Sequence, residues 1–104
     1  MFAIGDVTAI KLPVGLMLPK AGVFAHAEAE VVAHNIAAEI TGQGAHRRFD
    51  GFGSCFVEMG DGVAAYAKGN FYAEPAPSMT LRSPSRFWHW SKIYVEKRWL
   101  RRWF

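Results

Sequence analysis

The stretch SCFVEM (54–59), GDG (60–62) and VAAYAKGNFYAE (63–74) decides the fold. Two runs rich in apolar and aromatic residues flank an Asp-Gly turn, a pattern typical of an antiparallel β-hairpin. Pro75 and Pro77 are expected to end the second strand, because proline cannot donate a hydrogen bond to a neighbouring strand. Alternation along the first strand predicts two faces: Phe56 and Glu58 on one, and Cys55, Val57 and Met59 on the other.

The residues before the hairpin predict a strand, a loop and a long helix. Met1–Gly5 is expected to form a short strand, and a Pro- and Gly-rich loop follows it. The alanine-rich run VFAHAEAEVVAHNIAAEIT (23–41) predicts a helix that ends at Gly42. Its expected apolar stripe consists of Val23, Ala27, Val31 and Ala38, with His34 beside them and Glu28 and Glu39 on another face.

The end of the chain differs in charge from the rest. Residues 86–104 hold six Lys/Arg, one Asp/Glu and all four tryptophans, whereas residues 1–85 hold six Lys/Arg and eight Asp/Glu. The segment predicts an amphipathic helix that begins at a serine cap. Aromatic rings at the headgroup level, with arginines reaching water, suit a helix that lies on a membrane surface. The membrane-contact candidates are Trp99, Arg101, Arg102, Trp103 and Phe104.

Two other interpretations of this helix stay open. It could pack on the rest of the protein with its arginines solvated, or it could bind nucleic acid through its basic and aromatic residues. We favour the membrane surface over nucleic acid, because no nucleic-acid-binding fold motif accompanies the helix.

Length and composition limit the remaining possibilities. The chain has 104 residues, 51% of them hydrophobic and 20% charged, which predicts a globular protein of one domain or less. It contains no run long and apolar enough for a transmembrane helix, and its first residues do not read as a signal peptide. The single cysteine excludes an internal disulfide, and the spacing of the histidines predicts no metal site. We expect an α+β fold in three segments: 1–43, 44–85 and 86–104.

Three motifs carry a resemblance to a known family. They are FAIGDVTA (2–9), LPKAGVFAHAEAEVVAHNIAAEI (18–40), and FDGFGSCFVEMGDG (49–62) followed by KIYVEKRWL (92–100). In this order they resemble the C-terminal third of the sulfide:quinone oxidoreductase-like flavoproteins, within the pyridine nucleotide-disulfide oxidoreductase superfamily. The resemblance covers nearly the whole chain. It implies that the complete protein is an α/β flavoprotein with two dinucleotide-binding domains.

The family's Gly-rich turn for the flavin pyrophosphate and its substrate-side domain have no counterpart here. We therefore expect the chain to be a C-terminal fragment or a truncated reading frame, with a genuine short protein as the alternative. The fragment alone is expected to bind FAD weakly or not at all and to be inactive.

The resemblance implies roles for several residues. Gly5 and Asp6 would face the ribityl chain of FAD, and Lys20, Ala21 and Gly22 would polarise the flavin from a helix start. Ordinary turn and surface roles are the alternatives for these five residues. Cys55 would be catalytic, pairing in the complete enzyme with a second cysteine to hold sulfur; the alternative is a small buried hydrophobe. The candidates for quinone contacts are Phe71, Tyr72, Phe87 and Trp88.

The function that the resemblance implies is electron transfer from a reduced sulfur donor through FAD to a quinone. Such an enzyme would lie peripherally on a membrane, and we expect the bacterial inner membrane. The alternative is a non-catalytic module that binds a membrane surface or associates with itself. A homo-oligomer would then cover apolar faces that the fragment leaves exposed.

Overall fold

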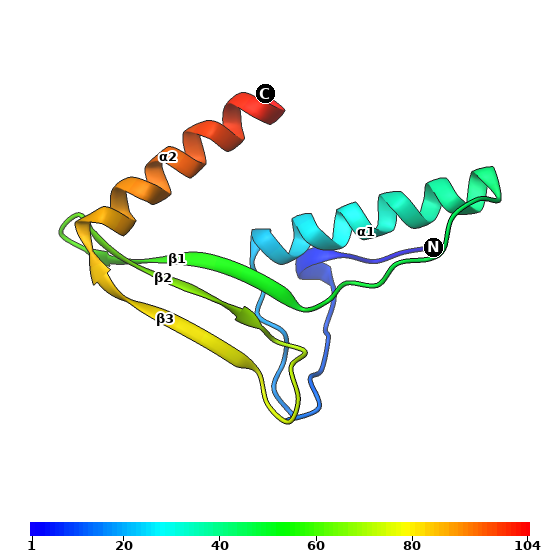
Figure 1. Cartoon of the computed structure of the whole chain (residues 1–104), viewed down its shortest axis with the longest axis horizontal. Helices are drawn as coiled ribbons and strands as arrows, with labels where there is room; N and C mark the ends of the chain where they lie inside the picture. Colours follow the sequence, from blue (N-terminus) through cyan, green and yellow to red (C-terminus); the bar gives the residue numbers. More distant parts are fainter. The chain divides into compact units, whose positions relative to one another are not determined.

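The computed structural model describes residues 1–104, and its fold is α+β, as expected. Two helices accompany a three-stranded antiparallel sheet in the order β1-β2-β3 (Figure 1). The elements in chain order are a 3-10 turn Gly5–Val7, α1 Gly22–Thr41, β1 Phe52–Gly60, β2 Val63–Asn70, β3 Ser78–Ser85 and α2 Arg86–Trp103. The chain divides into two compact units, residues 1–53 with 69–78, and residues 54–68 with 79–104.

The first unit is built on a small aromatic and aliphatic core. Leu12, Leu18 and Phe24 are buried, and the ring of Phe24 meets those of Phe49 and Phe71 edge to face, with centroids 6.0 and 5.3 Å apart. The loop before α1 doubles back on itself, because Leu18 N donates to Ile10 O at 2.8 Å. This return places Leu12 and Leu18 together at the start of the helix.

No strand forms at Met1–Gly5, where one was expected. The 3-10 turn Gly5–Val7 takes its place, and no other strand of the chain pairs with this segment. A strand needs a neighbour for its backbone hydrogen bonds, and an unpaired segment lacks that stabilisation.

The helix α1 begins at Gly22 and ends at Gly42, which adopts φ +67° as its C-cap. Its buried residues are Phe24, Glu28, Asn35 and Ala38. The buried face therefore lies beside the predicted stripe, and of that stripe only Ala38 is buried. Alanines occur on every side of α1, so the spacing of hydrophobic residues did not define its buried face. The prediction that Glu28 lies on another face than the buried one was therefore wrong.

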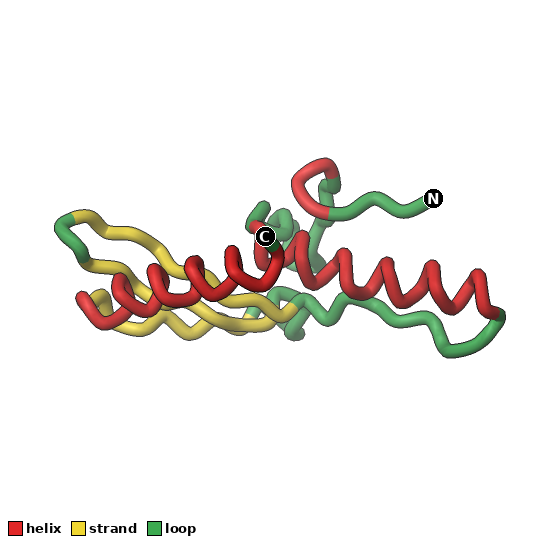
Figure 2. Tube along the Cα trace, turned by 90° about the horizontal axis from the view of Figure 1, so that it is seen from above, coloured by secondary structure: helices red, strands yellow, loops and turns green.

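Polar contacts attach the segment after α1 to the helix. The Asn35 side chain donates to Arg47 O at 3.0 Å and accepts from Arg47 N at 2.8 Å. Nε2 of half-buried His34 lies 3.0 Å from Ala45 O. The segment consequently runs back along α1 before it enters β1 (Figure 2).

The second unit holds most of the sheet and α2. The hairpin turn has φ +51° at Asp61 and +69° at Gly62, as a tight Asp-Gly turn requires. The ring centroids of Phe56 and Tyr66 lie 5.1 Å apart, and the Glu58 carboxylate contacts side chains of α2. On the other face of β1, Cys55, Val57 and Met59 are exposed, in agreement with the predicted alternation.

The helix α2 follows β3 directly, and Ser85 caps it by accepting a hydrogen bond from Trp88 N at 3.4 Å. The half-buried residues of α2 all lie between Trp88 and Ile93, and every residue from Tyr94 onward is exposed. No helix of the chain combines the length and apolar character that crossing a membrane requires.

Candidate functional site

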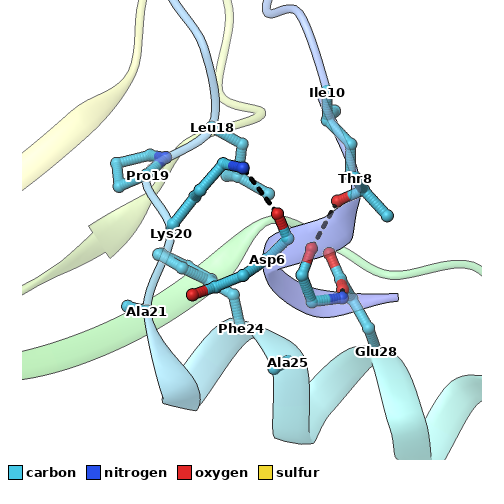
Figure 3. A pocket seen from close by; sticks show the side chains of 11 residues that line it. Asp6, Thr8, Ile10, Leu18, Pro19, Lys20, Ala21, Phe24, Ala25 and Glu28 are labelled. Carbon is cyan, nitrogen blue, oxygen red and sulfur yellow. Dashed lines mark hydrogen bonds between the residues drawn. The ribbon is translucent and has the colours of Figure 1, made fainter. Parts of the chain in front are cut away.

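The candidate site lies where the Gly5–Val7 turn meets the first turns of α1 (Figure 3). Gly5, Asp6, Lys20 and Ala21 line one pocket there, and Gly22 is the next residue, the first of α1. The fold thus gathers the five predicted cofactor-binding residues from two segments that are separate in the sequence.

Three side chains hold the backbone of the turn. Thr8 Oγ1 donates to Gly5 O at 2.7 Å, and Lys20 Nζ donates to Asp6 O at 2.5 Å. Gly5 N donates to Oε2 of Glu28 on α1 at 2.6 Å. The turn is therefore fixed to the helix on one side and to the segment before the helix on the other.

The start of α1 offers unsatisfied backbone donors. Ala21 is the N-cap, and no side chain caps the helix. The amides of Phe24 and Ala25 both donate to Ala21 O, at 3.0 and 3.2 Å. Without a side-chain cap, the first amides and the positive end of the helix dipole favour an anion or an electron-rich oxygen as partner.

The pocket encloses about 10 Å³, roughly the space that one water molecule needs. A larger ligand would therefore lie across its mouth. Asp6 is exposed there. The exposed ammonium group of Lys20 adds a positive charge beside it.

Glu28 belongs to the site, although its expected place was on another face. Only 7% of the residue is exposed, and its charge acts on Tyr72. Burial raises the pKa of the Tyr72 hydroxyl, and the negative charge of Glu28 raises this pKa further. The spacing of Phe24, Glu28, Asn35 and Ala38, four, seven and three residues apart, is the sequence signal that could have revealed this face.

Cys55 lies on β1 in the second unit and does not line the pocket of the first. Its thiol is exposed in this chain, which disfavours the interpretation of a small buried hydrophobe. No three His, Cys, Asp or Glu side chains of the chain come together in a cluster that could hold a metal ion.

The quinone-contact candidates divide between the two units. Phe71 and Tyr72 pack around the core of the first unit, where Tyr72 meets Phe49 edge to face at 5.5 Å. In the second unit, Trp88 stacks on a tyrosine of β2, while Phe87 is 67% exposed. The four residues do not form one pocket within either unit.

The exposed end of α2 combines cations with aromatic rings. A basic groove is lined by Tyr94, Lys97, Arg98 and Arg101. The guanidinium of Arg102 lies 5.3 Å from the ring centre of Trp103, and Trp99 lies within 6.5 Å of both Trp103 and Phe104. This end of the helix can therefore present positive charge and apolar rings to one partner.

No family model, curated protein or solved structure matches the chain. The interpretation of the site therefore rests on its own geometry and on the three motifs described above. The geometry is that of a turn and a helix start joined at one small pocket.

Proposed function

We propose that the chain is the C-terminal part of an FAD-dependent oxidoreductase that resembles sulfide:quinone reductase. The observation that supports this best is the meeting of the Gly5–Asp6 turn with Lys20 and the uncapped start of α1. The family resemblance implies flavin contacts for these same two segments. A helix start beside a lysine suits the electron-rich pyrimidine edge of a flavin.

The residues of the site have distinct roles in this proposal. The exposed Asp6 carboxylate accepts a hydrogen bond from a ribityl hydroxyl, and Lys20 with the helix start favours the reduced flavin. Bound FAD would supply two-electron transfer from a reduced sulfur donor to a quinone. The exposed thiol of Cys55 handles sulfur in the complete enzyme, together with a second cysteine outside this chain.

The small volume of the pocket limits what this chain does alone. Nothing in it cradles a pyrophosphate, so FAD binding is weak and is lost on dialysis, and sulfide-dependent quinone reduction is absent. A titration of the isotope-labelled chain with FAD, followed by NMR, tests the proposal. We expect shifts confined to the turn and to residues 20–23, and a loss of these shifts in Lys20→Met.

Lys11→Met is the matched control, because Lys11 is exposed in the same loop and does not line the pocket. This variant keeps the wild-type response to FAD. An FAD response that is absent at millimolar concentration, or equal in both lysine variants, contradicts the flavin site. An in-frame Gly-x-Gly-x-x-Gly segment in the DNA upstream of Met1 would support the larger enzyme independently.

The exposed end of α2 favours a second candidate function, a non-catalytic module at a membrane surface. Its cations and rings suit peripheral attachment to an anionic membrane, and we propose the bacterial inner membrane. In the enzyme proposal, the same attachment would bring the flavin near membrane quinone. Self-association through exposed apolar side chains is the remaining form of this candidate, and analytical ultracentrifugation would detect it.

A further inference from the structure

The candidate site contains one buried carboxylate. Glu28 is 7% exposed, and its Oε2 accepts the hydrogen bond from Gly5 N at 2.6 Å. Figure 3 shows its side chain rising from α1 toward the turn. A carboxylate in this position needs hydrogen-bond donors, because an unsatisfied buried charge is strongly unfavourable.

Gly5 needs this contact as much as Glu28 does. Its φ of +70° is a conformation that glycine adopts without strain, and it brings the turn close to α1. A Cβ at this position would lie 3.2 Å from the Cβ of Ala25. The Gly5 amide has no backbone acceptor among the hydrogen bonds of the turn, so Glu28 provides the partner that this donor requires.

The other two contacts of the turn depend on where Gly5 lies. Thr8 donates to Gly5 O, and Lys20 Nζ donates to the carbonyl of the next residue, Asp6. Thr8 belongs to the same short segment, and Lys20 is exposed. Glu28 is thus the one buried side chain that attaches the turn to the helix by a hydrogen bond.

We propose that Glu28 is the positioning residue of this site, whose carboxylate holds the Gly5–Val7 turn on α1 and so presents Asp6 and Lys20 beside the helix start. This inference builds on the proposed flavin site, but its central contact is a property of the free chain. A charged acceptor makes a shorter and stronger hydrogen bond than a neutral one. Glutamine in its place keeps an acceptor but loses the charge.

NMR of the full chain without ligand tests this role through the Gly5 amide. In the wild type, we expect slow hydrogen exchange of this amide and a downfield resonance, because a carboxylate accepts a short and strong hydrogen bond. Asp6→Asn keeps both properties, and Glu28→Gln moves the resonance upfield while retaining most of the protection from exchange. Glu28→Ala lowers the protection of the Gly5 amide at least roughly tenfold, with the amide of Ala38 on α1 unchanged.

Glu30→Gln is the matched control, because Glu30 lies on the same helix with a largely exposed side chain, paired with His26 at 3.4 Å. It leaves both properties of the Gly5 amide at the wild-type level. Glu28→Gln decides the question if Glu28→Ala fails to fold. An unchanged chemical shift of the Gly5 amide in Glu28→Gln, or equal effects of Glu28→Gln and Glu30→Gln, overturns the proposal.

The FAD titration separates this inference from the function on which it builds. If FAD moves the signals of residues 20–23 in the wild type, Glu28→Ala should lower the apparent affinity for FAD in this titration at least roughly tenfold. Lys11→Met should leave that affinity unchanged. If FAD moves nothing in the wild type, the flavin proposal fails, and the Gly5 amide alone then decides whether Glu28 positions the turn.

Discussion

The ring of Tyr66 on β2 lies nearly parallel to the indole of Trp88 on α2, with centroids 4.9 Å apart and planes inclined by 15°. Phe56 on β1 contacts the same tyrosine, and Phe87 meets the indole edge to face at 4.9 Å. This row of four rings is the apolar contact through which the first turn of α2 attaches to the sheet. From Tyr94 onward, the helix continues beyond it with every residue exposed.

Trp88→Ala should weaken this attachment. Trp88 is only half-buried, so we expect a loss of about 2 kcal/mol in the free energy of unfolding, below the cost for a fully buried tryptophan. Urea unfolding followed by circular dichroism measures it. Trp90→Ala is the control, because Trp90 is 66% exposed on the same helix and should cost less than about 0.5 kcal/mol. Equal losses in the two variants would contradict the role of the stacked rings.

The first turns of α2 should also detach from the sheet in acid. Glu58 Oε1 lies 3.1 Å from Lys92 Nζ and 3.2 Å from His89 Nδ1. The hydrogen bond from Lys92, with a smaller contribution from His89, holds the Glu58 pKa below its ordinary value of 4.5. A lowered pKa in the folded state stabilises the fold above the unfolded value, and this contribution is lost as pH falls through the folded value.

We therefore expect the attachment of α2, measured by tryptophan fluorescence, to weaken as pH falls below about 4.5. Glu58→Gln should remove this part of the pH dependence. Glu96→Gln serves as the control, since Glu96 is exposed on the same helix, and its pH profile should match the wild type. A Glu58→Gln profile identical to that of the wild type would show that the carboxylate does not matter.

Gly53 on β1 should tolerate no side chain. A Cβ at this position would overlap Cε1 of Phe24, which is 6% exposed and held in the core of the first unit. The ring can move only by disturbing that core, so Gly53→Ala should cost about 2 kcal/mol in unfolding free energy. Gly22→Ala is the control, because no atom lies within 4 Å of a Cβ at that position, and it should cost nothing measurable. Thermal unfolding of both variants checks this.

The hairpin, the long helix and the capped C-terminal helix could be predicted because local signals define them. An Asp-Gly turn with φ above zero at both residues, a run of alanines, and a serine before a basic aromatic segment each act within a few residues. The five cofactor-binding candidates were selected by the family resemblance and remain predictions, and only the fold shows that their two segments meet.

Other features depend on contacts that no local pattern reveals. The strand β3 contains a proline and several serines and forms because β2 provides an edge to pair with. Glu28 is buried because a distant glycine amide needs an acceptor, and hydrophobic spacing assigns such a carboxylate to the surface. The absence of a strand at Met1–Gly5 has the opposite cause, since nothing in the chain pairs with that segment.

Cys55 should react in the native protein. Its exposure on β1 predicts that a thiol reagent such as 5,5′-dithiobis(2-nitrobenzoate) labels it within minutes in the absence of denaturant. Cys55→Ser should abolish labelling and leave the unfolding free energy within about 0.5 kcal/mol of the wild type. Labelling that requires denaturant would restore the interpretation of a buried hydrophobe. In a complete enzyme, the same variant should lose most turnover and keep flavin.

The end of α2 should bind anionic vesicles. Residues 94–104 carry four Lys/Arg and one Asp/Glu, and each basic residue contributes at most about 1 kcal/mol near an anionic surface. Aromatic burial adds roughly 25 cal/mol per Å², which salt does not screen. The chain should therefore sediment with such vesicles and remain partly bound at about 0.15 M salt, where the Debye length is about 8 Å.

Deleting residues 94–104 should abolish this binding while keeping the stacked Trp88 and the ion pairs of Glu58. Replacing Trp99 and Trp103 by alanine should make the remaining binding more sensitive to salt, because charge attraction then carries most of it, whereas Trp90→Ala should not. Nucleic-acid binding would instead fall steeply with salt in the wild type, following the number of phosphates contacted. If the intact and shortened chains sediment equally, or neither does, the membrane proposal fails and α2 is a solvated helix anchored by its first turns.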